Sequence, residues 1–408
     1  MPVNAVATSL HNPDAFIAKG TPQFTRTSLA LFAGGFATFA LLYCVQPLMP
    51  VLSQEFALSA AQSSLVLSIS TIMLAVGLLF TGPLSDAVGR KPMMVASLLC
   101  AALLTLAGAL MPTWEGVLVT RALLGLALSG LAAVAMTYLC EEIDPDCLGL
   151  SMGLYIAGNA IGGMGGRLIS GVLVDFVDWR WAVGSLGLLA LLAGLLFWRV
   201  LPESRHFKPA PLDVRRIGQA FVRHLRDRGL PWLFLEAFLL MGAFVTLFNY
   251  IGYRLLDAPY HLSQALVGLL SVVYLSGIYS SAKIGALADR LGRRRVLWAV
   301  IVLMLAGLLL TLLPQVPAIL GGMLLFTFGF FGAHSVASSW VGRRAQQARG
   351  QASSLYLFSY YLGSSLAGTA GGLFWHDFGW TGVALFIAAL LVAALLAALH
   401  LSRLPEAA

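Results

Sequence analysis

The amino-acid sequence predicts an all-α membrane protein in which twelve transmembrane helices form two pseudo-symmetric six-helix bundles. Three observations lead to this prediction. Hydrophobic residues make up 59% of the 408 residues and charged residues only 11%, whereas a soluble domain is about 25% charged. Apolar segments long enough to cross a bilayer recur along the chain. Two short motifs also occur in both halves of the chain at one constant offset, which indicates an internal duplication.

The composition excludes several other classes of protein. So few charged residues cannot cover so much apolar mass in water, which argues against a soluble globular fold and against disorder. The 42 glycines show no every-third-residue period, so the chain is not collagen-like. The four cysteines form no CxxC pair and are expected to pack as small apolar residues, with no metal site and no disulfide framework.

Each expected span has about 20 mainly apolar residues, the length that a helix needs to cross a bilayer. The twelve spans are residues 28–50, 61–83, 92–111, 114–138, 149–174, 180–200, 231–254, 265–288, 296–313, 317–340, 350–374 and 380–402. The sequence therefore predicts an N-terminal bundle over 28–200 and a C-terminal bundle over 231–402, joined by a linker at 201–230. Residues 1–27 are expected to be a loosely ordered tail and residues 403–408 a short one. No small-residue cleavage site follows the first span, so we interpret it as a retained helix.

Lysine and arginine lie almost entirely on one side of this arrangement. Only Arg180 and Arg254 fall on the other side, so the positive-inside rule predicts that both termini and the linker are cytoplasmic. The same rule explains the net charge of +7 without a nucleic-acid partner. One inner loop, 139–148, carries four acidic residues and no basic one, but acidic residues have little topological weight. The basic stretch Arg215–Arg228 is either an amphipathic segment on the inner membrane surface or a disordered linker.

The internal repeat is carried by two pairs of strings. GPLSDAVGRKP at 82–92 matches GALADRLGRRR at 285–295, and LPES at 201–204 matches LPEA at 404–407. Both pairs lie 203 residues apart, from 82 to 285 and from 201 to 404. Parallel halves of six spans are the organisation of a large class of secondary transporters.

The repeated GxLaDrxGRrx string resembles motif A of the major facilitator superfamily, and the chain is similar to that family over nearly its whole length. The segments GLYIAGNAIGGMGGRLISG (153–171), WRW (179–181) and LPESRHF (201–207) more narrowly resemble the YnfM-type drug and small-solute exporters. The resemblance implies the family's fold, a bacterial inner-membrane location and transport by alternating access. It also assigns a conformational latch to motif A and its repeat: Gly82, Asp86, Gly89, Arg90 and Lys91, and Gly285, Asp289, Gly292 and Arg293. The alternative is a charge cluster that only sets topology.

Two arginines lie inside expected spans, where an ionisable group is costly and indicates function. Arg121, followed by Gly125, resembles the family's motif B, whose arginine the family associates with proton coupling. Arg167 lies at a similar depth on the next span, because both are about 10 Å below the outer surface at 1.5 Å per residue. We expect water, a carboxylate or an anionic ligand to separate the two charges. Alternatively, either arginine snorkels outward or caps backbone carbonyls.

The span at 149–174 also carries Gly158, Gly162, Gly166 and Ser170 at four-residue spacing, a ridge that allows close helix contact. The family's antiporter signature there, motif C, is written GxxxGPxxGG. Asn159 occupies the place of its proline, so the antiporter assignment is weakened. Asn159 is expected either to line a cavity or to bond a neighbouring helix.

Glu236 is the candidate proton carrier, because it is the carboxylate that lies clearly within a span and burial favours proton exchange near neutrality. The alternative is an interfacial glutamate paired with linker arginines. His334 is a second candidate, although a core histidine is the simpler interpretation. Neutral or aromatic side chains expected to line a cavity are Gln46, Asn249 and Tyr274.

These observations predict a proton-coupled secondary transporter, most simply an exporter of a neutral or anionic drug-like or metabolite compound. A proton-coupled symporter that imports an organic acid fits the arginines equally well. The sequence contains no GK[ST] phosphate loop, HExxH or GxSxG motif, so neither a primary pump nor an enzyme is expected. We expect no cofactor or metal, a proton gradient as energy source, and a monomer in the lipid bilayer whose partners are protons and a small solute.

Overall fold

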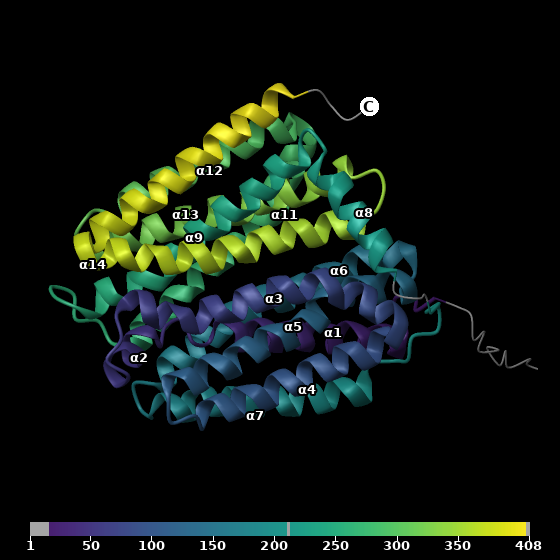
Figure 1. Cartoon of the computed structure of the whole chain (residues 1–408), viewed down its shortest axis with the longest axis horizontal. Coiled ribbons are helices and arrows are strands. Elements are labelled where there is room, and N and C mark those ends of the chain that lie inside the picture. Colours follow the sequence, from purple (N-terminus) through teal and green to yellow (C-terminus); the bar gives the residue numbers. More distant parts are fainter. Residues whose placement is uncertain (1–15, 210–212, 405–408) are drawn as a thin grey trace, which may run out of the picture.

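A computed structural model describes residues 16–209 and 213–404, which fold into two stacked layers of long helices (Figure 1). The first layer contains α1 (Pro22–Tyr43), α2 (Met49–Glu55), α3 (Ala60–Val88), α4 (Arg90–Ala109), α5 (Trp114–Glu142), α6 (Pro145–Leu173) and α7 (Trp179–Val200). Helix α8 (Val214–Leu225) joins it to the second layer: α9 (Leu230–Leu256), α10 (Gln264–Leu269), the 3₁₀ turn η1 (Leu270–Val273), α11 (Tyr274–Leu291), α12 (Arg293–Leu310), α13 (Val316–Arg344) and α14 (Arg349–Arg403). We call these layers the first and second halves.

Ten of the described helical segments are long and apolar enough to cross a membrane. Two features reconcile this number with the twelve expected spans. The 55-residue α14 is broken at Gly379, whose φ of 57° and ψ of −147° are not helical, so it contains both the 350–374 and the 380–402 spans. Helix α12 has 18 residues and begins with three arginines, so its uncharged part is shorter than the roughly 20 residues of a full span. The chain is therefore an all-α, multi-span protein.

Helix α1 differs from the expected 28–50 span at both ends. It begins at Pro22, inside the expected tail, where the Thr21 hydroxyl accepts a hydrogen bond from the backbone N–H of Phe24. It ends at Tyr43 although the apolar run continues, because Pro47 disfavours helical geometry in the residue before it and lacks an N–H. Of the expected tail 1–27, residues 1–15 lie outside the described residues, and the backbone N–H of Ile17 bonds the carbonyl of Glu142 at 2.8 Å.

Small residues bring the helices of the first half into close contact, as the four-residue spacing predicts. A Cβ at Gly162 of α6 would collide with the carbonyl of Phe36 on α1. A Cβ at Gly125 of α5 would collide with the carbonyl of Ser70 on α3. Such packing is typical of membrane helices, whose association depends on close backbone approach.

The two copies of motif A occupy equivalent places at one end of the molecule. Gly89 joins α3 to α4 with φ 108°, and Gly292 joins α11 to α12 with φ 90°; both conformations favour glycine. Helix α8 lies at this same end, on the right of Figure 1. We call it the basic end, and we call the end that carries α2 and the Gly379 break the opposite end.

Candidate functional site

The two halves are hydrogen-bonded to each other toward the opposite end. Gln46 Nε2 donates to Asn249 Oδ1 at 2.6 Å. The Thr369 hydroxyl donates to Ser68 Oγ at 2.8 Å, and the Ser271 hydroxyl donates to the carbonyl of Met164 at 3.1 Å. Each of these bonds joins one half to the other and lies nearer the opposite end than the basic end.

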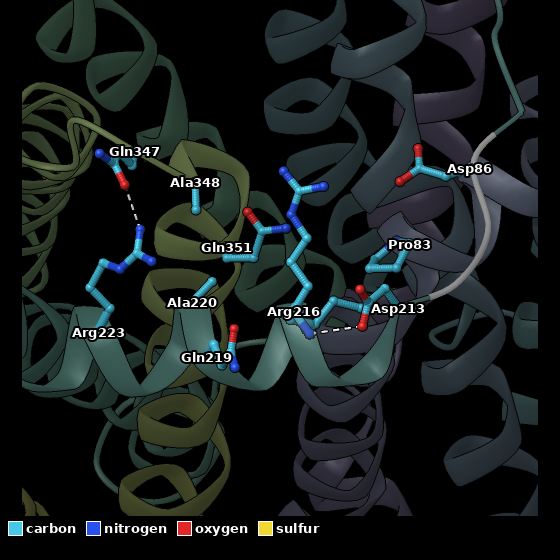
Figure 2. A pocket seen from close by; sticks show the side chains of 11 residues that line it. Pro83, Asp86, Asp213, Arg216, Gln219, Ala220, Arg223, Gln347, Ala348 and Gln351 are labelled. Carbon is cyan, nitrogen blue, oxygen red and sulfur yellow. Dashed lines mark hydrogen bonds between the residues drawn. The ribbon is translucent and has the colours of Figure 1, made fainter.

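Toward the basic end, a cavity lies between the last turns of α3, helix α8 and the start of α14. Its volume is about 570 Å³, far above the roughly 30 Å³ that one water molecule occupies in the liquid. We call this cavity the vestibule. Figure 2 shows Arg216 of α8 and Gln351 of α14 extending into it, with Asp86 of α3 on the far side. The two halves are therefore closed at one end and parted at the other.

Arg167 lies at the contact between the halves and is 3% exposed. Its Nε donates to Gln46 Oε1 at 2.5 Å, and its Nη1 donates to the carbonyl of Gly163 at 2.6 Å. The guanidinium also lies 4.1 Å from the ring centre of Tyr43 and 4.7 Å from that of Tyr274. Aromatic faces attract a cation, so this charge is stabilised by rings and neutral oxygens, and among the described residues no carboxylate pairs with it.

Gln46 and Asn249 occupy equivalent positions in the two halves, because they are separated by the same 203 residues as the repeated motifs. Gln46 therefore links Arg167 of the first half to Asn249 of the second. The cavity around these three side chains has a volume of about 20 Å³, enough for about one water molecule. Of the expected cavity residues, Gln46, Arg167, Asn249 and Tyr274 are thus brought together, although here they form a closed contact.

The side chain of Arg121 is hydrogen-bonded to backbone carbonyls of the first half. Its Nη1 and Nη2 donate to the carbonyls of Leu41 and Leu42 at 2.9 and 2.7 Å, and its Nε donates to the carbonyl of Val66 at 3.0 Å. The last carbonyls of a helix lack intrahelical partners, and α1 ends at Tyr43. The structure therefore shows the backbone-capping alternative, and Arg121 points into the first half, away from the contact with the second.

Glu236 is fully buried in α9, and among the described residues neither of its carboxyl oxygens has a hydrogen-bond partner. The alternative of pairing with linker arginines is therefore wrong. An ionised carboxylate without a partner in an apolar interior is very costly, so this environment favours the neutral acid. On neighbouring helices of the same half, the Tyr356 hydroxyl lies 2.9 Å from His334 Nδ1. His334 is half-buried and packs against Tyr360, with 4.8 Å between ring centres.

Asn159 lies on α6 against α1. Its Oδ1 occupies the space that a Cβ at Gly35 would need, and among the described residues this buried oxygen has no hydrogen-bond partner. It neither joins the Arg167 cluster nor contacts the second half by any hydrogen bond that the structure describes.

The first copy of motif A is tied together by acidic residues of its own half. Arg90 pairs with Asp86 at 2.5 Å and forms a two-pronged pair with Glu141 at 2.7 and 3.0 Å. Lys91 pairs with Glu203 at 2.7 Å. Glycines 82 and 285 have open or nearly open surroundings, and neither is forced by packing.

The second copy is more exposed and has different partners. Arg293 pairs with Asp289, the same pairing as that of Arg90 with Asp86. Arg343 also reaches Asp289 at 3.3 Å. The position equivalent to Glu141 is Arg344, which pairs instead with Asp227 beyond α8. The two copies therefore share their loop geometry and differ in the acid that holds the arginine.

Sequence reasoning did not assign a role to several residues of these networks. The acidic loop 139–148 was a topological exception, yet Glu141 binds Arg90, and Glu142 Oε1 accepts hydrogen bonds from the backbone N–H groups of Arg205 and His206 at 2.7 and 3.0 Å. A signal was present: each copy of motif A is followed by an LPE string at the same offset, and Lys91 and Glu203 come from that matched pair.

Comparison with known proteins identifies the family. The Major Facilitator Superfamily matches residues 31–279 and again 233–408. The chain belongs to this superfamily. It is 62% identical over 94% of its length to the inner membrane transport protein YnfM of Escherichia coli K12, of which it covers 92%. It is 49% identical over 95% of its length to the MFS-type transporter YybF of Bacillus subtilis 168, of which it covers 96%.

The fold also resembles that of a solved transporter. A solved bacterial homolog of the human lysosomal transporter Spinster superposes with a TM-score of 0.78 at 14% identity, covering 94% of this chain and 98% of that one. The chain is thus a transporter of the YnfM type, with the superfamily fold and a multi-span inner-membrane location, and its relatives are transporters, not enzymes.

Proposed function

We propose that this superfamily member exports a small neutral or anionic solute in exchange for protons by alternating access, with the basic end in the cytoplasm. The observation that carries the proposal is Arg167, a buried cation at the contact between the halves, whose partners in the described part of the chain are neutral oxygens and aromatic rings. Such a group attracts anionic or hydrogen-bond-accepting solutes and repels cationic ones.

Glu236 is the proposed proton carrier. Its carboxyl is buried without a hydrogen-bond partner among the described residues, so in this conformation the neutral acid is favoured. Opening the second half to water would favour release of the proton. A buried acid whose solvation changes between conformations is a physical basis for coupling protons to the conformational cycle.

The orientation is part of the proposal. Lysine and arginine gather at the basic end, including the exposed arginines of α8, and basic loops favour the cytoplasmic side. The vestibule then opens to the cytoplasm, where an exported solute enters.

Flux into and out of proteoliposomes tests this function. We expect an imposed proton gradient to drive efflux of anionic and neutral solutes against the direction of proton flow, with cationic solutes unaffected and a protonophore abolishing the effect. Glu236→Gln is expected to keep solute exchange between equal concentrations but to lose the response to the gradient. The matched control is Arg180→Gln, which removes a charge that pairs with Glu55 at the opposite end, away from both Arg167 and Glu236.

Two results would contradict the proposal. Flux that does not depend on the proton gradient would contradict proton coupling. A Glu236→Gln variant that responds to the gradient like the unmodified protein would contradict the role of Glu236 as proton carrier. Solute movement in the same direction as the protons would favour the symporter, which Arg167 supports through the same attraction for an organic acid.

A further inference from the structure

We propose that Arg167 binds the carboxylate of an aromatic organic anion, and that the anion opens the contact between the halves by replacing Gln46 on the guanidinium and so releasing the bond from Gln46 to Asn249. The inference rests on the proposed function and names the class of its substrate.

The head of the ligand follows from the donors of Arg167. A guanidinium binds a carboxylate with two parallel, charge-assisted hydrogen bonds, which are about twice as strong as bonds between neutral groups. Here the Nε instead donates to the amide oxygen of Gln46. A carboxylate therefore competes favourably for this edge of the guanidinium, whereas a neutral amide in the ligand gains nothing over the amide already present.

The body of the ligand follows from the rings around the arginine. Tyr43, Tyr274 and Phe248 surround the guanidinium, with ring centres 4.1, 4.7 and 5.8 Å from it. The aromatic surface continues into the second half, where Phe244 lies 5.5 Å from Tyr274 and 3.9 Å from Phe330. Aromatic pairs contribute beyond their buried area, so these rings favour a planar, aromatic body over a sugar or a small aliphatic acid.

The coupling to opening follows from the two ends of the Gln46 amide. Its oxygen accepts from Arg167 and its nitrogen donates to Asn249 across the two halves. A carboxylate that replaces the Gln46 oxygen on Arg167 frees the Gln46 side chain, which is then no longer held in place to bond Asn249. The surrounding cavity has a volume of only about 20 Å³, the size of about one water molecule, so an aromatic ring fits only when the halves separate.

Calorimetric titration of the full-length protein in detergent, without a proton gradient, tests this site. The probes are benzoate, salicylate and phenylacetate, with benzamide as the uncharged isostere of benzoate. We expect the carboxylates to bind and benzamide not to bind. Arg167→Gln and Arg167→Lys should each weaken binding at least tenfold, because lysine lacks the planar fork, and Arg180→Gln should bind like the unmodified protein.

Two variants at one position test the competition. Gln46→Ala removes the competitor and should bind benzoate more tightly. Gln46→Glu supplies a permanent carboxylate to Arg167 and should weaken binding at least tenfold. Every variant is first compared by size-exclusion chromatography, and because the two Gln46 substitutions are expected to act in opposite directions, a general loss of fold cannot imitate the result.

Clear outcomes would overturn the inference. These are no binding of any of the three carboxylates, equal binding of benzamide and benzoate, or equal affinities in Arg167→Gln and the unmodified protein. Weaker binding in both Gln46 variants would contradict the competition. Absent binding with intact gradient-driven flux would contradict this inference alone, whereas intact binding with gradient-insensitive flux would contradict the proposed function alone.

Discussion

Two buried arginines of the first half disperse their charge in different ways. Arg121 donates to three backbone carbonyls where α1 ends and α3 passes, and Arg167 lies among aromatic rings at the contact between the halves. The same residue type at a similar depth therefore has a structural environment in one place and, in our proposal, a recognition role in the other. What separates them is the presence of unsatisfied carbonyls beside Arg121, which follows from the end of α1 at Tyr43.

Substitution of Arg121 is predicted to act on stability. Arg121→Ala leaves the carbonyl of Leu42 without a donor, whereas those of Leu41 and Val66 still accept from Cys44 Sγ and from the Ser70 hydroxyl. An unsatisfied buried acceptor costs about 1–3 kcal/mol, so the free energy of unfolding should fall by about that amount. Arg121→Lys keeps the positive charge but loses the planar guanidinium, so its free energy of unfolding should lie between that of Arg121→Ala and that of the unmodified protein. Thermal and denaturant unfolding in detergent measures both. An Arg121→Ala variant as stable as the unmodified protein would show that water satisfies the carbonyl of Leu42.

At the scale of elements, the first copy of motif A connects α3, α4 and α5 through ion pairs. Arg90 is held by Glu141, whose side chain is 25% exposed, and by Asp86, whose side chain is 42% exposed. Asp86 also faces the vestibule (Figure 2), where the halves are parted. The more buried acid is therefore suited to holding the loop, and the more exposed one to contacting the second half when the vestibule closes.

The two acids are predicted to respond differently to neutralisation. Glu141→Gln should lower the melting temperature more than Asp86→Asn, because it removes the two-pronged, more buried pair. Asp86→Asn should leave the fold intact and lower transport by about fivefold or more, the small end of conformational coupling between sites. Melting curves and flux at matched expression compare them. Normal transport by Asp86→Asn would mean that motif A here only sets topology.

Helix α8 is anchored to the second half at its C-terminal end. His224 lies 3.1 Å from the carbonyl of Ala348, and Asp227, just beyond the helix, pairs with Arg344 at 2.5 Å. Partial burial raises the pKa of Asp227, but the hydrogen bonds from Arg344 and from the backbone N–H groups of Gly229 and Leu230 outweigh it and hold that pKa below its usual value. Of the two alternatives for the linker, the described part is a packed amphipathic helix.

The lowered pKa of Asp227 makes a pH-dependent contribution to stability. A carboxyl whose pKa is lower in the folded state stabilises the fold above its unfolded pKa of about 3.9, and this contribution is lost as the pH falls through the folded pKa. Asp227→Asn should therefore melt below the unmodified protein at pH 7, and the two curves should converge below about pH 4. A difference that persists unchanged at low pH would assign the effect to packing.

The elements were largely predictable because apolar length and caps are local properties. The basic loops, the repeat at 203 residues and the glycine ridge of α6 all follow from the printed sequence. The end of α1 was missed because a continuous apolar run masked the effect of Pro47. The site was only partly predictable: Gln46, Arg167, Asn249 and Tyr274 were identified singly, but their meeting depends on how two halves dock, and docking leaves no periodic signal in one sequence.

At the scale of the whole molecule, two halves with equivalent motifs touch near Arg167 and part at the vestibule. Because Gln46 and Asn249 are equivalent positions, their hydrogen bond joins the halves where the repeat relates them to each other. The central claim is that the solute passes between these halves, which open at one end as they close at the other.

Paired distance measurements by electron spin resonance in lipid nanodiscs test that claim most directly. In a cysteine-free variant, one label pair sits at exposed Gln54 and Asp257 at the opposite end, and a second at exposed Asp146 and Arg290 at the basic end. We predict a closed opposite end and an open basic end in one population, and a shift between pH 8 and pH 5.5 that lengthens one distance as it shortens the other. Distances that stay fixed, or that lengthen and shorten together, would contradict the account.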